Sequence, residues 1–278
     1  MITRGKTEKA IQTDSILFIA LVLLPGIILA STVFFLSSVF ALAPANNDAR
    51  EEEIQLLFDQ GWQLLSRMHE DLSGLDKALA LYDKVLALDP ENKDVYWKIA
   101  EITFKKADEE ADEIKRKALY NKVLEVSKKA AKIDSNSVGA HYWMGVSSVR
   151  LAQMSGIVQS LSLVTQAKRE LVKAIDLDPD HRFSVLAGAV LAAIYTESPW
   201  PLRNLDQALE YAQEAIAKDP KLTIASEKLA QVYFKKKQYD KAKKEIHRCL
   251  AIEEPTYIWD SILYDWPAVK RLLKELED

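Results

Sequence analysis

Cysteine is almost absent from this sequence, and its few histidines stand far apart. The single cysteine, Cys249, has no partner for a disulfide within the chain and cannot form a cysteine-ligated metal site alone. The histidines, His69, His141, His181 and His247, never approach the short spacings of zinc ligands. We therefore expect no metal site, and we expect Cys249 to pack in the core as a small apolar residue.

Glycine and proline are also scarce, with eight and nine residues respectively in a chain of 278. The sequence lacks a glycine-rich phosphate loop, a dinucleotide-binding glycine motif and the Gly-x-Ser-x-Gly turn of serine hydrolases. We therefore expect neither an enzyme nor a bound cofactor. Most prolines lie at the boundaries of predicted helices, where their missing N–H is tolerated, and this favours an all-α fold.

An excess of basic residues is missing as well. The 37 Lys and Arg residues are outnumbered by 41 Asp and Glu residues, and the net charge at pH 7 is −4. A nucleic-acid-binding domain needs a basic face that neutralises phosphates. Nucleic acid is therefore not an expected partner.

Charge is absent altogether from Ser15 to Ala43, a run of 29 residues. A transmembrane helix needs about 20 apolar residues, whereas the apolar core of a cleavable signal peptide has about 7–15. We therefore predict a transmembrane signal-anchor over residues 15–43. The basic residues of the tail 1–14 keep that tail in the cytoplasm by the positive-inside rule. The expected location is a bacterial inner membrane, crossed once, with the C-terminal domain facing the periplasm.

Cleavage of this segment is the alternative. Ala43, Pro44 and Ala45 offer small residues at a suitable spacing, but Pro44 would lie at the scissile bond and make a poor protease substrate. No cysteine lies nearby, so a lipid anchor is not expected.

The most regular stretch of the chain runs from Leu222 to Pro255. Its small and large apolar residues fall on one face of each of two predicted helices, at Leu229, Ala230 and Tyr233, and at Ala242, Ile246 and Cys249. This order resembles the tetratricopeptide-repeat (TPR) family, in which helix pairs stack to bury their apolar faces. The resemblance covers most of residues 48–255. It implies an α-solenoid that serves as a binding scaffold.

The ends of the helix pairs are marked by a polar turn, usually Asp-Pro. The turns lie at Asp89-Pro90, Asp134-Ser135, Asp178-Pro179, Asp219-Pro220 and Glu254-Pro255. The expected fold is an all-α, TPR-like α-solenoid of about five helix pairs over residues 44–255, preceded by the one N-terminal transmembrane helix. Residues 256–278 are predicted to form a C-terminal capping helix, because a solenoid needs an end piece with one polar face.

Three local features follow from the same pattern. The turn of the second pair is expected near Asp108–Asp112, within a charged stretch. Gly145 should allow close approach of its partner helix. Trp259 and Trp266 are expected to seal the last repeat.

The TPR register also predicts which side chains line the concave groove. Aromatic, aliphatic and charged residues mix there, which suits a protein or peptide segment better than a phosphate. The predicted partner-binding residues are Trp97, Phe104, Tyr142, Arg150, Glu227, Gln231 and Phe234. The alternative is that these side chains pack against an adjoining helix.

Trp200 lies in an irregular stretch between two prolines, Pro199 and Pro201. The prolines leave the tryptophan little conformational entropy to lose, so it is either a contact point for a partner or a plug against the repeats. We favour packing against the repeats.

A narrower resemblance appears in Gly139–Gln153 and Tyr195–Ile216. These segments resemble the TPR proteins of tripartite substrate-binding (TRAP-type) transporters, called T-components, and the regulators of microtubule dynamics. The first resemblance implies a periplasmic helical array that presents a groove to a substrate-binding protein. The transporter-associated form is tethered as a lipoprotein, and this chain lacks the cysteine for that tether.

Two functions are therefore expected as alternatives. The first is a membrane-anchored TPR scaffold that binds a protein or peptide partner through its concave groove. The second is an extracytoplasmic accessory protein of a TRAP-type solute transporter that binds a small ligand or the substrate-binding protein. A long open groove would favour the scaffold, and a sealed pocket ringed by Trp and Arg would favour the accessory protein.

Overall fold

The computed structural model describes residues 43–199 and 201–278. The predicted tail 1–14 and transmembrane segment lie outside the described residues, apart from Ala43, and so does Trp200. Across the described residues, no helix combines the length and hydrophobicity that crossing a bilayer requires. The compact unit that contains the helix pairs spans Glu53–Asp278.

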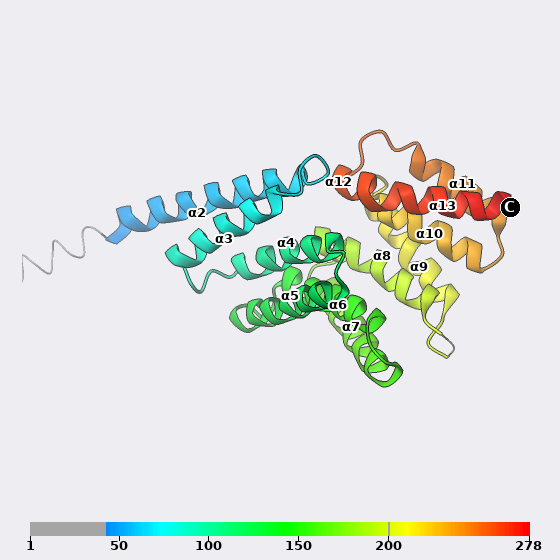
Figure 1. Ribbon diagram of the computed structural model, residues 1–278, viewed down its shortest axis with the longest axis horizontal. Coiled ribbons are helices and arrows are strands. Elements are labelled where there is room, and N and C mark those ends of the chain that lie inside the picture. The colour runs from blue at the N-terminus through cyan, green and yellow to red at the C-terminus, as the bar shows by residue number, and fades with distance from the viewer. Residues whose placement is uncertain (1–42, 200) are drawn as a thin grey trace, which may run out of the picture. The chain divides into compact units, whose positions relative to one another are not determined.

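Regular structure in the described residues is entirely helical. The helices of the pairs α4/α5, α6/α7, α8/α9 and α10/α11 lie side by side and antiparallel, as Figure 1 shows. The prediction of an all-α, TPR-like solenoid is confirmed. The helices are α2 (Ala43–Ser66), α3 (Gly74–Leu88), α4 (Val95–Glu109), α5 (Glu113–Ile133), α6 (Val138–Gln153), α7 (Ile157–Leu177), α8 (Arg182–Glu197), α9 (Leu205–Lys218), α10 (Thr223–Lys235), α11 (Tyr239–Leu250), α12 (Ile258–Asp260), the π-helix η1 (Ser261–Asp265) and α13 (Trp266–Glu277).

The helix ends follow the polar turns of the sequence. Helices α3, α5, α7 and α9 each end directly before an aspartate that serves as the C-cap. The turn of the second pair spans residues 110–112, as predicted, and the Asp112 carboxylate accepts hydrogen bonds from the N–H groups of Ile114 and Lys115. This cap satisfies two N–H groups that the helix leaves without partners.

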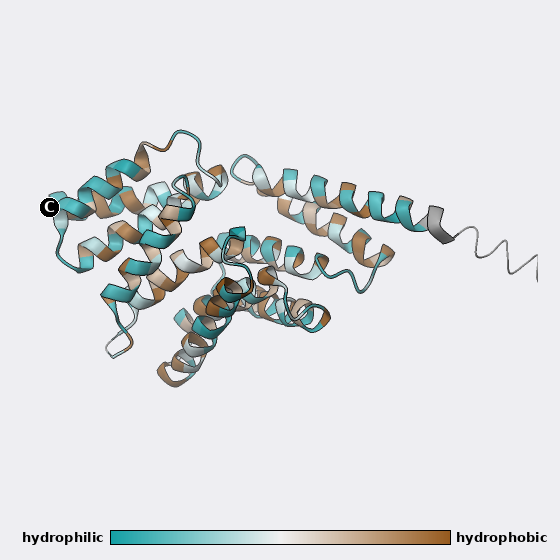
Figure 2. Cartoon of the chain, turned by 180° about the vertical axis from the view of Figure 1, so that it is seen from behind, coloured by the Kyte–Doolittle hydropathy of each residue, from teal (hydrophilic) through white to brown (hydrophobic). Residues whose placement is uncertain are grey.

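The helices are amphipathic, with hydrophilic and hydrophobic residues alternating along most of them (Figure 2). Small residues let the paired helices approach closely. A Cβ atom added to Gly145 would lie 2.6 Å from Cγ of Leu171 and 3.3 Å from the carbonyl oxygen of Ala167. Gly145 in α6 therefore packs directly against α7, its partner helix, as predicted.

His141 is a buried core residue in the same pair. Its Nδ1 lies 2.8 Å from Oε2 of Glu170, and its Nε2 lies 3.1 Å from the carbonyl oxygen of Ser135. The hydrogen bond from His141, assisted by the guanidinium of Arg169, holds the pKa of Glu170 below its ordinary value although burial opposes this. His141 thus ties α6 to α7.

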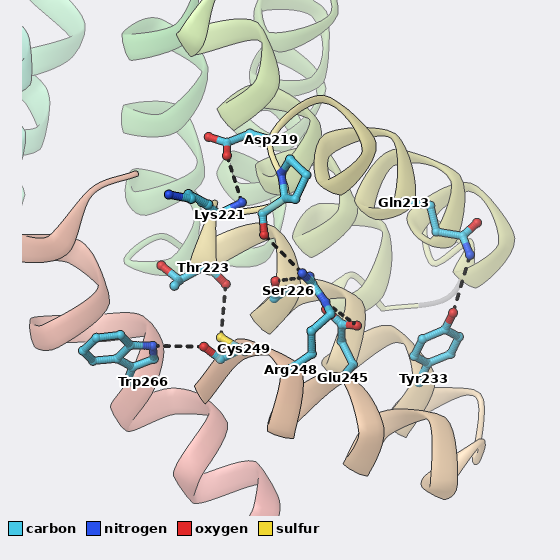
Figure 3. A network of polar contacts seen from close by, with 11 residues as sticks. Gln213, Asp219, Lys221, Thr223, Ser226, Tyr233, Glu245, Arg248, Cys249 and Trp266 are labelled. Atoms are coloured by element: carbon cyan, nitrogen blue, oxygen red, sulfur yellow. Dashed lines mark hydrogen bonds and ion pairs between the residues drawn. The ribbon is translucent and has the colours of Figure 1, made fainter. Parts of the chain in front are cut away.

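The last repeat is closed by α13, which packs against α10 and α11 through Val269 and Leu272. The indole N–H of Trp266 donates to the carbonyl oxygen of Cys249 at 3.2 Å (Figure 3). In the same view, Arg248 bridges Glu245, Ser226 and the carbonyl of Pro220. Trp266 therefore seals the last repeat, as predicted.

Trp259 reaches further than the predicted seal, because its apolar cluster includes Leu222 and Ala225 of the last repeat and also residues of α2. Its ring packs edge-on against Trp62 of α2, with ring centroids 5.5 Å apart. The reason is that residues 258–265 form the first part of one continuous helical run with α13, and this part lies against α4, α8 and α10. We call this segment together with Tyr257, that is Tyr257–Asp265, the strap.

Candidate functional site

A cavity of about 370 Å³ lies between the strap and the first helices of four successive pairs, α4, α6, α8 and α10. Its aromatic lining comes from both sides, with Phe104 and Tyr142 on the helices, and Tyr257 and Tyr264 on the strap. Volumes of this size are typical of sites that hold a small molecule or a few side chains. The cavity is the candidate functional site.

Four of the seven predicted groove residues line this cavity: Phe104, Tyr142, Arg150 and Glu227. The other three do not. Trp97 packs edge-on against Phe183 at 5.4 Å, Phe234 belongs to the apolar cluster around Ile246 and Val269, and Gln231 hydrogen-bonds to Glu227. The alternative interpretation, packing against an adjoining helix, describes Trp97 and Phe234, whereas the contact of Gln231 is within its own helix.

Tyr142 is buried rather than displayed. Only 5% of it is exposed, and its ring stacks on Phe183 with centroids 4.9 Å apart and planes 17° apart. Burial raises the pKa of its phenol well above the ordinary value. The ring is therefore part of the core beneath the cavity, and truncating it would remove packing as well as a binding surface.

Two arginines that line the cavity, Arg182 and Arg150, are paired with acids of the same unit. Arg182 donates two hydrogen bonds to Glu101, at 3.2 and 2.9 Å, and its guanidinium lies 3.9 Å from the ring centroid of Phe183. Arg150 lies 3.3 Å from an oxygen of Asp108. Because these two guanidinium groups already hold carboxylates, they are poorly placed to bind a phosphate.

Asp265 is a buried carboxyl group in the cavity wall. Burial, together with the nearby carboxylates of Glu227 and Asp260, raises its pKa to about 7, while the hydroxyl of Thr223 and the ammonium of Lys228 oppose the shift. An aspartate ordinarily titrates near 4.

Hydrogen-bond counting agrees with a neutral Asp265. Its Oδ2 lies 2.6 Å from Oγ1 of Thr223, which lies 2.7 Å from Oγ of Ser261, which lies 2.9 Å from the carbonyl oxygen of Tyr257. Three contacts need three protons, but the two hydroxyls supply only two and a carbonyl supplies none. A proton on Asp265 would supply the third, in agreement with the raised pKa.

Several residues of this site were not predicted from the sequence, namely Lys105, Arg182, Asp260 and Asp265. Lys105 and Asp260 form a largely buried ion pair, with Nζ and Oδ1 2.5 Å apart. The signal in the sequence was the strap itself, because YIWDSILYD carries two carboxylates among its aromatic residues, more polar groups than a purely apolar cap would need.

Comparisons with known proteins give the same fold. A tetratricopeptide repeat profile matches residues 202–259, and a profile of regulator of microtubule dynamics protein 1-3 matches residues 57–188. Of the two segments in which the sequence resembles the regulators of microtubule dynamics, this match includes Gly139–Gln153 and ends before Tyr195–Ile216. No curated protein sequence matches the chain significantly.

Solved structures resemble the chain at low sequence identity. A thermophilic TPR protein of Thermus thermophilus is 19% identical with a TM-score of 0.59, and the match covers 80% of this chain and 99% of that one. The pilF protein of Pseudomonas aeruginosa is 14% identical with a TM-score of 0.55, and the match covers 82% of this chain and 92% of that one. At such identities the likeness concerns the fold alone. Residues 202–259 thus match the tetratricopeptide-repeat family, and the described residues share the fold of solved TPR proteins.

Proposed function

We propose that the chain is a non-enzymatic, membrane-anchored TPR scaffold that captures a short segment of a protein partner in the cavity beneath the strap. The observation that carries the proposal is the lining of this cavity. Aromatic rings from α4 and α6 line it, and acidic and basic side chains joined in ion pairs surround these rings. A short peptide offers matching aromatic, aliphatic and charged groups, whereas a phosphate or nucleic acid offers only one sign of charge.

The membrane part of the proposal rests on the uncharged run 15–43 and on the basic residues in front of it. The expected result is that the full chain sediments with membranes, resists carbonate extraction and is digested by protease only from the periplasmic side. A mature protein that begins near Asn46 and remains in the supernatant would contradict the anchor and leave the binding proposal standing.

A second candidate is the accessory protein of a TRAP-type transporter. The observation in its favour is that the strap closes one side of the cavity, which leaves about 370 Å³, a volume suited to a small ligand. If this candidate is correct, a small solute rather than a protein should protect the cavity against chemical labelling.

The binding test fills the cavity without deleting core packing. Ala193 in α8 lines the cavity and is only partly buried, so Ala193→Trp should occupy the space that a partner would use. Ala217 in α9 is exposed outside the cavity, which makes Ala217→Trp a matched control.

Crosslinking pull-downs from membranes should show at least tenfold weaker capture by Ala193→Trp, which corresponds to about 1.4 kcal/mol. Ala217→Trp should capture the partner normally, and circular dichroism should show both variants folded. Normal capture by folded Ala193→Trp would remove the cavity from the proposed function.

A further inference from the structure

We infer that the strap is a resident ligand of the partner-binding site, and that the partner competes with it through an aromatic residue followed directly by a carboxylate. This inference rests on the proposed function, because it names the chemistry that the same cavity takes. Two side chains, Trp259 and Asp260, hold the strap in place.

Trp259 is the aromatic anchor of the strap. It is 5% exposed, it meets Trp62 of α2 nearly at right angles, and it contacts Tyr257 at 5.3 Å between ring centroids. Edge-to-face pairs of this kind stabilise contacts beyond the area they bury. Large rings in such pockets are the usual hot spots of peptide recognition.

Asp260 is the charged anchor. Its Oδ1 lies 2.5 Å from Nζ of Lys105, a residue 155 positions away in the sequence. Lys105 also lies 5.5 Å from the ring centroid of Tyr264, whose hydroxyl donates to Oε1 of Glu109 at 2.5 Å. Lys105 and Glu109 are one helical turn apart on α4, so a single helix face holds two polar groups of the strap.

The strap interface combines apolar packing, through Tyr257 and Trp259, with buried polar contacts of Asp260 and Asp265. Burying two charges costs desolvation free energy, which their mutual attraction only partly offsets. A buried ion pair therefore determines which residues dock together more than it stabilises the docked segment. Interfaces rich in charged and hydrogen-bonded groups are typical of contacts that exchange. By contrast, α13 is held by Val269 and Leu272, which gives the strap a fixed end when its middle leaves the cavity.

The same geometry defines the competitor. It is a short segment of about one to two helical turns, in which Trp or Tyr precedes Asp or Glu, so that the ring reaches Trp62 and the carboxylate reaches Lys105. A partner with a basic residue at the second position would meet Lys105 and be rejected by like charge.

A peptide with the sequence of Thr256–Asp265, TYIWDSILYD, is the probe. In the full chain, Trp259→Ala combined with Asp260→Asn loosens the resident strap and leaves α13 in place. Fluorescence anisotropy should show the labelled peptide binding this variant at least tenfold more tightly than the wild-type chain. A peptide with Ala and Asn at the same two positions should bind neither protein. Equal peptide affinity for the wild type and the folded variant, or binding to neither, would overturn the inference.

Two further measurements guard against a variant that fails to fold. In the wild-type chain, hydrogen exchange within residues 257–265 should speed up when the peptide is added in excess, because the probe replaces the strap. A Lys105→Glu chain should prefer a peptide with Lys at the Asp260 position. Unchanged strap exchange under saturating peptide would overturn the inference. The test needs no natural partner, so its failure is distinct from failed capture by Ala193→Trp.

Discussion

The last helix pair and the strap that follows it are neighbours in sequence, yet they are held in opposite ways. In α10 and α11, Ala230, Ile246 and Cys249 are buried together and meet residues that are close in the sequence. In the strap, Trp259 and Asp260 meet α2 and α4, at the far end of the repeats.

The two regions also differ in how often their contacts recur along the chain. The apolar contacts of the repeats recur in every pair, as expected for a solenoid in which each repeat packs on its neighbours. The strap contacts occur once and combine buried aromatic rings with an ion pair and hydrogen bonds. Substitutions in the pairs should therefore destabilise the whole unit, whereas substitutions in the strap should release one segment.

The largest effect is expected at Gly145, inside a pair. Gly145→Leu places side-chain atoms where Leu171 and the Ala167 carbonyl already lie, and such overpacking should cost about 3 kcal/mol. Thermal melting of residues 46–278 should show a clear drop in Tm, with helicity kept below the transition. Gly156→Ala is the control, because nothing lies within 4 Å of the added Cβ atom, and its Tm should be nearly unchanged. Equal Tm values for both variants would contradict the packing of α6 on α7.

A smaller effect is expected at Lys105. Lys105→Ala leaves the buried Asp260 without its cation, which should weaken strap docking by about 2 kcal/mol, a loss limited by release of the strap. Hydrogen exchange should rise in residues 257–265 and stay constant in α6 and α7. The neighbouring Lys106→Ala, which breaks a pair with the exposed Asp76, is the control and should change little. Uniformly faster exchange across all helices would mean that the strap belongs to the general core.

A pH dependence of the strap is expected from Asp265. Because burial raises its pKa to about 7 from an ordinary value near 4, the docked strap holds a proton that the released strap gives up. The stabilisation is therefore fully present below the ordinary pKa and is lost as pH rises through about 7.

The variant Asp265→Asn tests the direction of this pH dependence. The wild-type strap should be docked more firmly at pH 5 than at pH 8, by at least tenfold in hydrogen-exchange protection, since one pKa unit corresponds to about 1.4 kcal/mol. The variant should lose most of this difference. The carboxylate of Glu170, whose pKa is lowered, loses its contribution only in more acidic solution, so it does not interfere. The opposite sign, with firmer docking at pH 8, would rule out a protonated Asp265.

The sequence predicts the repeats well because their physics is local. An aspartate after an apolar helix end marks where α3, α5, α7 and α9 stop, and Gly145 marks a close helix contact. Each feature depends on residues within one pair. The prediction therefore needed no knowledge of how distant segments meet.

The cavity was only partly predictable for the opposite reason. The TPR register brought Phe104, Tyr142, Arg150 and Glu227 to one site but also suggested Trp97, Gln231 and Phe234, which do not line it. The register gives the direction of a side chain from its helix, but it does not say what covers that side chain. The strap covers the groove, and nothing in the repeat period encodes a contact between residues 155 positions apart.

The most direct test of the account is photo-crosslinking from inside the cavity of the full chain in membranes. A photoreactive phenylalanine at Ala193 should form an adduct with a protein partner, and excess TYIWDSILYD peptide should abolish that adduct. The same probe at the exposed Ala217 should form none. An adduct from Ala217 that persists with the peptide, with none from Ala193, would contradict the claim that the cavity beneath the strap is the binding site.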